Sequence, residues 1–180
     1  MADKFNSTNI FTDLPFHLSY LNHINITDNN HYHDFYELFL VTRGSVTHLV
    51  NNEIQELKEN FLILIRPQDT HYFKKSDNEN NHYFNFAFKK SIFQELITYL
   101  DYENEIQNLL NSNLPPLVTI SNRKKYRIED KIEKINTITT EQLHLKNIHC
   151  KHLLLELFTQ FLETETDQEN NNRIPEWLKE

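Results

Sequence analysis

Three side chains able to bind a metal ion or a polar ligand lie close together in the first quarter of the chain. The segment just before the apolar run 38–41 contains all three: His31, His33 and Glu37. Alternate side chains of a β-strand share a face, so these odd-numbered residues are expected to point the same way. Two imidazoles and a carboxylate with open positions form a partial shell for Fe(II), Mn, Ni or Zn.

A fourth candidate is His71, which follows Pro67 at the start of another short apolar segment. Antiparallel pairing would place this histidine beside the first three side chains. The same groups can also hydrogen-bond backbone carbonyls or a bound polar ligand without any metal, so the spacing leaves both alternatives open. The remaining histidines show no convergent spacing and are expected in surface or structural roles: His17, His23, His48, His144, His149 and His152.

Two aromatic residues adjoin this group and complete a predicted ligand pocket. Tyr36 and Phe39 flank Glu37 in sequence, and such rings can stack on the apolar face of a sugar while polar groups bind its hydroxyls. Pocket residues are therefore predicted to be His31, His33, Tyr36, Glu37, Phe39 and His71. His31, His33, Glu37 and His71 are also the candidate ligands of a divalent transition metal, the one cofactor considered.

No arrangement typical of nucleophilic or phosphate-transfer catalysis is present. Ser45 and Ser91 lack the glycines of a nucleophile elbow, and Cys150 falls on an apolar helical face, where a core thiol is expected. The chain contains one glycine, which excludes a glycine-rich phosphate loop. We therefore predict no catalytic residue and no enzyme activity.

The elements that must position these residues are strands up to about residue 90. Short runs rich in β-branched and aromatic residues alternate with turn signals, which predicts an antiparallel sandwich or barrel. Gly44 and Asn51-Asn52 mark two hairpins, since both positions suit a positive φ. The predicted strands are 16–24, 35–43, 45–51, 53–57, 61–66, 71–74 and 82–88.

Beyond residue 90 the apolar period becomes helical. Helices are predicted after Ser91, over 105–110, after Ser121 and over 147–165. The last of these has an apolar face wider than one intramolecular contact requires, which predicts a homodimer through this region. The polar composition of residues 164–173 predicts a linker. Residues 174–178 resemble the start of a further helix.

Composition restricts the partners and the compartment. A net charge of −8 argues against a grip on a phosphate backbone. The single cysteine excludes an internal disulfide, residues 1–15 lack a signal-peptide pattern, and no run is long enough to span a membrane. We expect a cytoplasmic protein without membrane contact.

Residues 31–44 resemble the first cupin motif, whose positions are occupied here by His31, His33, Glu37 and Gly44. Residues 59–73 resemble the second motif of AraC-type regulators, with Pro67 followed by His71. Asp69 stands where enzyme cupins usually have glycine, and the histidine comes one residue early. Asn60 and Lys75 replace the glycine and asparagine at the ends of that motif. The segments HYHDFYELFLVTRG and NHYFNFAF are similar to the sugar-responsive subgroup, especially regulators of chitobiose and cellobiose use.

This resemblance implies a mainly β protein with C-terminal helices: a cupin double-stranded β-helix barrel followed by an α-helical dimerisation region. The barrel would bind a sugar or sugar phosphate, and DNA would be bound only by a domain outside this chain. The alternative is a metal-dependent cupin enzyme, an isomerase or dioxygenase; the departures in the second motif favour the sensor. The expected parts are a sensing barrel over 1–90, a helical region over 91–166 and a linker over 167–180.

Overall fold

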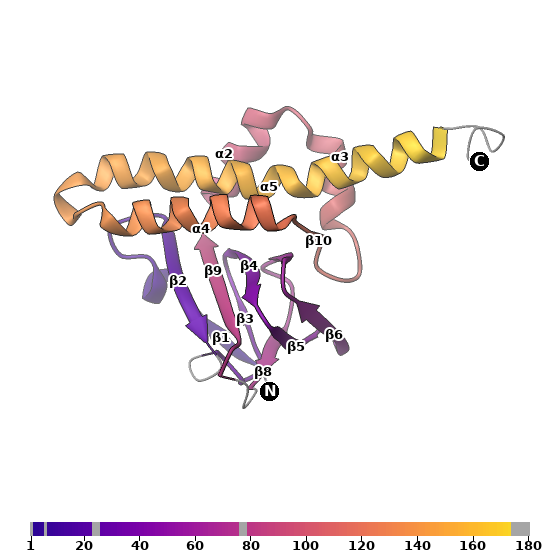
Figure 1. Ribbon diagram of the computed structural model, residues 1–180, viewed down its shortest axis with the longest axis horizontal. Helices are drawn as coiled ribbons and strands as arrows, with labels where there is room; N and C mark the ends of the chain where they lie inside the picture. The colour runs from indigo at the N-terminus through magenta and orange to yellow at the C-terminus, as the bar shows by residue number, and fades with distance from the viewer. Residues whose placement is uncertain (1, 6, 23–25, 76–78, 174–180) are drawn as a thin grey trace.

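Two five-stranded sheets lie beneath a pair of long helices (Figure 1). The computed structural model describes residues 2–5, 7–22, 26–75 and 79–173. The first sheet has the order β1 (Asp3–Phe5), β3 (His31–His33), β8 (His71–Lys74), β5 (Ser45–Val50), β6 (Glu53–Lys58). The second has the order β10 (Leu117–Thr119), β7 (Phe61–Ile65), β4 (Tyr36–Arg43), β9 (His82–Phe88), β2 (Phe16–Asn22). The predicted cupin-type barrel followed by helices is confirmed.

The central strands of the second sheet, β7, β4 and β9, are buried on both faces, which explains their nearly continuous apolar sequences. Leu38 and Leu40 of β4 belong to a core shared with the helices. Phe39 and Val41, which alternate with them, belong to a separate core inside the barrel. Strand alternation thus divides one apolar run between the helical layer and the barrel interior.

Asparagine takes positions that need a positive φ. Gly44 has φ 78°, and a Cβ there would lie 2.1 Å from Oδ1 of Asn81. Asn51 and Asn52, with φ of 50° and 69°, form the hairpin between β5 and β6. Asn60 has φ 74°, so the residue that replaces the motif's glycine retains its backbone conformation. The hairpin predicted at Asn51-Asn52 is confirmed. The hairpin predicted at Gly44 is wrong, because Gly44 joins β4 to β5, which belong to different sheets and do not pair.

The helical layer covers one side of the barrel. Its long members, α4 (Asn122–Thr137) and α5 (Leu143–Arg173), run alongside each other and are linked through the short helix η1 (Thr140–Gln142) (Figure 1). The predicted cap of α4 is confirmed, since Oγ of Ser121 accepts a hydrogen bond from the backbone N–H of Lys124 at 3.3 Å. Cys150 is buried in the helical core, and burial raises the pKa of its thiol to about 11, so it remains protonated at neutral pH.

The predicted basis for dimerisation was wrong. Leu154 and Phe158 of α5 are buried within one protomer, where α2 (Lys90–Leu100), α4 and the second sheet cover them. The apolar face is wide because it contacts several elements of its own chain. An intermolecular contact through α5 would have to use residues of this helix that are less buried, such as Leu155.

Several elements differ from the sequence prediction. The short elements β1, α1 (Ser7–Ile10), β3 and β10 were missed, because three or four residues are too few to show a period. β1 pairs with β3 in parallel, so the barrel is not wholly antiparallel. β10 also interrupts the region 91–166 expected to be helical. Between α2 and α4 lies α3 (Glu103–Leu110), as predicted.

The linker predicted over 164–173 is helical, since α5 continues to Arg173. These residues include neither proline nor glycine, and adding turns to a helix already anchored by packing requires no new nucleation. The predicted helix start at 174–178 lies outside the described residues. No helix in the described part of the chain is long and apolar enough to cross a membrane.

Candidate functional site

Three histidines meet where β3 and β8 pair. His31 lies directly opposite His71 in the antiparallel register, and their ring centroids are 4.3 Å apart. The ring of His33 lies 5.3 Å from that of His71. All three are buried, so the predicted convergence of His71 on the His-x-His pair is confirmed.

Backbone carbonyls fix the protonation of two of these rings. Nδ1 of His31 is 2.8 Å from the carbonyl oxygen of Asn29, and Nδ1 of His33 is 2.7 Å from that of Phe35. A carbonyl oxygen only accepts, so each Nδ1 carries the hydrogen. In the neutral ring Nε2 then has a free lone pair, the form in which histidine binds a metal or accepts a hydrogen bond.

Burial favours the neutral rings. Desolvation lowers the pKa of His31, although the carbonyl of Asn29 opposes the shift. Desolvation also lowers the pKa of His71 well below its ordinary value, and the neighbouring histidines lower it further. A histidine with a lowered pKa is uncharged at neutral pH, so His31 and His71 each have a nitrogen lone pair available.

Glu37 contributes the carboxylate of the cluster. One carboxylate oxygen lies 3.6 Å from Nε2 of His33, and the other accepts a hydrogen bond from the side-chain amide of Asn85 at 3.3 Å. Donor atoms of His33, Glu37 and His71 all lie within 4.8 Å of one another. Nε2 of His33 and of His71 is buried without a hydrogen-bond partner among the described residues.

This donor set fits a divalent transition metal. Two neutral imidazoles and a carboxylate are ligands that Fe(II), Mn, Ni and Zn accept, and each ring is held through its other nitrogen, as metal-binding histidines usually are. His33, Glu37 and His71 would hold the ion, with His31 adjacent. A metal there would act as a Lewis acid on an oxygen of a bound ligand.

A cavity of about 280 Å³ opens beside the cluster. It has a polar side formed by histidines, Glu37 and Asn85, and an apolar side contributed by rings and aliphatic groups. Part of its wall comes from the N-terminal segment, where the ring of Phe5 lies edge-on to His31 with centroids 4.7 Å apart. The lining residues are Phe5, Ile10, His17, Ser19, Leu21, Thr27, His31, His33, Phe35, Glu37, Asn85 and Ala87.

Three residues predicted for the pocket do not line the cavity. His71 belongs to the histidine cluster beside the cavity and not to its wall, and the two aromatic residues lie elsewhere. Tyr36 is on the opposite face of β4, where its ring lies 4.1 Å from that of Phe93 in the helical core. Phe39 shares the face of Glu37 but packs deeper in the barrel, with its ring 4.1 Å from that of Phe73. The prediction that Tyr36 lines the pocket was wrong, because even-numbered residues of β4 face the helices.

Sequence reasoning missed other cavity residues. Phe35 stacks on His33 with centroids 4.4 Å apart, and its odd number could have placed it on the face of Glu37. Asn85 and His17 reach the cavity because β9 pairs with both β4 and β2. That pairing joins residues far apart in the chain, and no local spacing indicates it.

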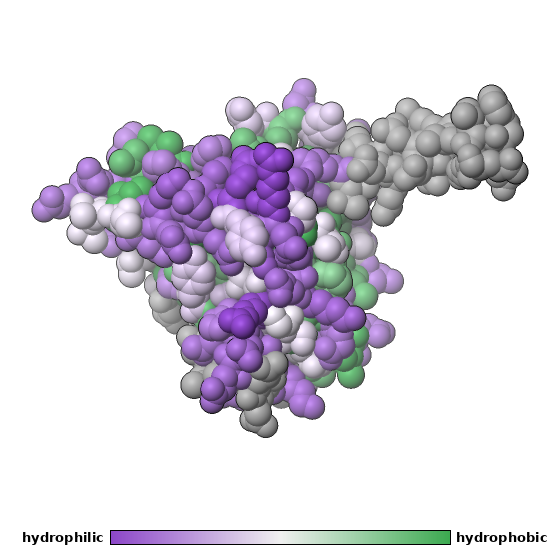
Figure 2. All heavy atoms as spheres, viewed as in Figure 1, coloured by the Kyte–Doolittle hydropathy of each residue, from purple (hydrophilic) through white to green (hydrophobic). Residues whose placement is uncertain are grey.

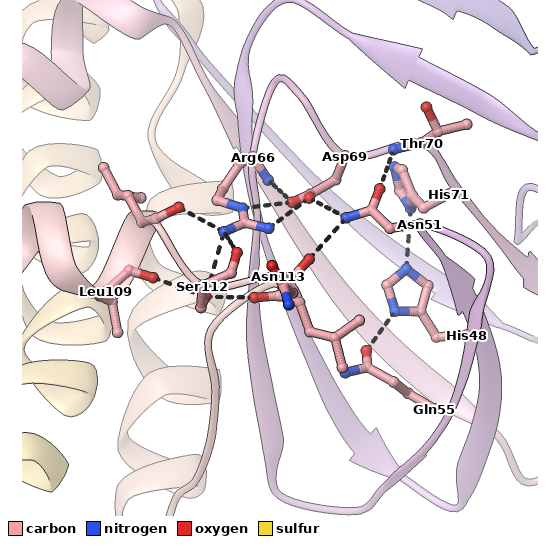
Figure 3. A network of polar contacts seen from close by, with 12 residues as sticks. His48, Asn51, Gln55, Arg66, Asp69, Thr70, His71, Leu109, Ser112 and Asn113 are labelled. Atoms are coloured by element: carbon pink, nitrogen blue, oxygen red, sulfur yellow. Dashed lines mark hydrogen bonds and ion pairs between the residues drawn. The ribbon is translucent and has the colours of Figure 1, made fainter.

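His48 was also missed as part of the cluster. It is fully buried on β5, and its Nε2 lies 3.2 Å from Nδ1 of His71 (Figure 3). Its Nδ1 lies 3.2 Å from the side-chain oxygen of Gln55 on β6. Desolvation lowers the pKa of His48 to about 4, so this ring too is neutral.

A buried ion pair lies near the histidines, at the turn between β7 and β8 (Figure 3). Nε and Nη2 of Arg66 donate to the two carboxylate oxygens of Asp69, at 2.9 and 2.8 Å. Nη1 donates to the carbonyl of Leu110, the last residue of α3, and to that of Ser112 in the following loop. Asn51 donates to Asp69 and accepts from the backbone N–H of Thr70. The turn that leads to His71 is thereby attached to the helical region.

A barrel with a partly polar cavity beside a helical layer defines a small-molecule-binding domain of the cupin type. Residues 21–174 match the model of the AraC-like ligand binding domain, and the chain belongs to this family. No curated protein matches it in sequence.

Solved structures with the same fold include ToxT from Vibrio cholerae. Apo ToxT K231A is 12% identical over 88% of this chain and 58% of its own, with a TM-score of 0.60. Wild-type ToxT bound to an unsaturated fatty acid is 17% identical over 83% of this chain and 54% of its own, with a TM-score of 0.53. A Cupin 2 conserved barrel domain protein from Salinispora arenicola is 13% identical over 49% of this chain and 75% of its own, with a TM-score of 0.38. This chain thus spans little more than half the length of the ToxT chains.

Proposed function

We propose that the chain senses a small polar molecule for a transcription regulator and is not an enzyme. One observation carries the proposal: Nε2 of His33 and of His71 is buried without a hydrogen-bond partner among the described residues, and His33 lines a cavity. A buried lone pair without a partner costs free energy, and a ligand that donates hydrogen bonds would recover it. DNA binding would belong to a part of the protein outside this chain.

We propose a sugar or sugar phosphate as the ligand. A cavity of about 280 Å³ is at the lower limit of small-molecule sites, which suits a ligand of monosaccharide size. Hydroxyl groups could donate to Glu37 and His33, while the rings of Phe5 and Phe35 would cover the apolar face of the sugar. The long chain of a fatty acid would desolvate Glu37 without donating a hydrogen bond to it.

Titration calorimetry with monosaccharides, disaccharides, sugar phosphates and an unsaturated fatty acid would test this proposal, with metal analysis of the same sample. For a sugar that binds, Glu37→Ala should weaken binding by about tenfold or more, because a hydrogen bond to a charged group is lost. Tyr36→Phe is the matched control and should bind normally, since Tyr36 packs on the helical side. Binding of the fatty acid alone, or of a sugar that Glu37→Ala binds equally well, would contradict the proposal.

We further propose a homodimer through the outer face of α5, in the helical part expected over 91–166. Leu145 and Ile148 are 42% and 50% exposed, and they continue toward Leu155 with helical spacing. Figure 2 shows hydrophobic groups at the end of the α4–α5 hairpin within a largely hydrophilic surface. Beside this stripe is an apolar groove of about 350 Å³ between α2 and α5, which includes Leu155 and Tyr99. A second copy of α5 could cover both.

Ile148→Glu is expected to convert this dimer to a monomer at micromolar concentration, because it would place a charge in an apolar contact. Multi-angle light scattering would measure the mass. Ile54→Glu is the matched control: Ile54 is 68% exposed on β6, far from α5, and the variant should remain dimeric. If the wild-type protein has the mass of a single chain, the proposed interface does not form.

A further inference from the structure

Two residues outside the cavity form a chain of hydrogen bonds that ends at His71. Gln55 lies half-buried on the edge strand β6, and its side-chain oxygen is 3.2 Å from Nδ1 of His48. Nε2 of His48 is 3.2 Å from Nδ1 of His71 (Figure 3). The ring of His48 also stacks on Phe73, with centroids 4.6 Å apart and 23° between planes, which fixes its orientation.

The hydrogens on this chain are not independent. The side-chain oxygen of Gln55 accepts, so Nδ1 of His48 carries the hydrogen and Nε2 of its neutral ring accepts. Nδ1 of His71 must then donate, since two lone pairs facing each other at 3.2 Å would make no bond. A neutral His71 with hydrogen on Nδ1 has a bare Nε2, the nitrogen that His48 does not contact and that has no hydrogen-bond partner among the described residues. A ring nitrogen of His71 lies within 4.8 Å of donor atoms of His33 and Glu37.

We propose that Gln55 and His48 are positioning residues that select the tautomer of His71, so that its Nε2 lone pair faces the ligand site. Their effect passes through His71, because neither residue lines the cavity. The inference rests on the proposed function in one respect: the lone pair matters only if a hydrogen-bond donor or a divalent cation binds there.

Reversing the donor at Gln55 should reverse the whole chain. In Gln55→Lys an ammonium donates to Nδ1 of His48, the hydrogen of His48 moves to Nε2, and Nδ1 of His71 becomes the acceptor. His71 then carries its hydrogen on Nε2 and loses the lone pair. Gln55→Glu keeps an acceptor and should preserve the wild-type tautomers. Ile54→Lys, a matched charge change at an exposed neighbour, should also preserve them.

The tautomers are measured directly by long-range ¹H–¹⁵N NMR of the ligand-free, histidine-labelled protein, with signals assigned by single variants. We expect wild-type His71 to have a protonated Nδ1 and a bare Nε2, and Gln55→Lys to exchange the two. His48→Gln should preserve the wild-type state of His71, since its oxygen can accept, whereas His48→Leu should not. Wild-type His71 with hydrogen on Nε2, or an unchanged tautomer in Gln55→Lys, would overturn the proposal.

A second measurement separates this inference from the proposed function. With Ni²⁺ alone as the probe, calorimetry should show binding about 10- to 100-fold weaker in Gln55→Lys than in wild type, and unchanged in Ile54→Lys. Equal Ni²⁺ affinity in Gln55→Lys, despite exchanged tautomers, would overturn the role of the lone pair. If the tautomers exchange as expected but the wild type binds neither Ni²⁺ nor any sugar, tautomer selection stands and the proposed function fails.

Discussion

Asp69→Ala is expected to lower the free energy of unfolding by about 3–5 kcal/mol, the usual cost of removing one partner from a buried ion pair. Asp69 is fully buried, and its two oxygens accept from the guanidinium of Arg66. Without them Arg66 retains a buried charge whose remaining bonds are to neutral groups, two of them backbone carbonyls at the end of α3 and in the following loop. Urea denaturation followed by circular dichroism would measure the loss.

The exposed ion pair of Asp28 with Lys75 gives a matched control. Its atoms are 3.1 Å apart and both side chains are about half exposed, so Asp28→Ala should cost less than about 1 kcal/mol. Arg66→Met combined with Asp69→Ala should be less destabilised than the two single changes added together, because no unpaired charge remains. If Asp69→Ala matches Asp28→Ala within error, the ion pair does not stabilise the turn.

The parts of the fold that sequence alone could predict are those with a local period. The single strand expected through 31–41 is two strands of different sheets, so Glu37 of β4 meets His31 and His33 of β3 across the barrel. Alternation did place His31 and His33 on one face of β3, and helical spacing placed Ile128 and Ile132 of α4 in the core. Both follow from the geometry of a single element, in which each side chain's direction depends on its number. The convergence of His71 required one further assumption, an antiparallel pair.

The remainder of the site depends on contacts between distant segments. Asp69 looked like a departure from a motif, yet it pairs with Arg66 and connects to a loop more than 40 residues later. His48 was one histidine among ten until β5 was paired with β8. Tyr36 shows the opposite error, because its neighbour Glu37 suggested a site role that strand parity excludes. Neighbours in sequence are on opposite faces of a strand, so proximity to a site residue was the wrong criterion.

Acidification from pH 7 to pH 5 is expected to destabilise the protein through the buried histidines. The pKa of His48 is about 4 in the folded state and about 6.5 when unfolded, so between these values the unfolded chain binds the extra proton. The contribution of His48 to the free energy of unfolding is therefore greatest above pH 6.5, and it is lost as the pH decreases toward 4. His48 alone should account for about 2 kcal/mol at pH 5. His71 and His31, whose pKa values are also lowered, act in the same direction.

The variant His48→Gln lacks one of the imidazoles that bind these protons, so it measures the contribution of His48 alone. Between pH 6 and pH 5 its free energy of unfolding should fall less steeply than that of the wild type, by about 1.4 kcal/mol per pH unit, the value for one proton. Staying above pH 5 separates this effect from carboxylates, including Glu59, whose pKa is lowered mainly by its hydrogen bond from Lys125. His149→Gln, at an exposed position of α5, should have the wild-type slope, because water solvates that ring in both states. Equal slopes for His48→Gln and wild type would mean that His48 binds its proton equally well in the folded barrel, which the desolvation of its fully buried ring opposes.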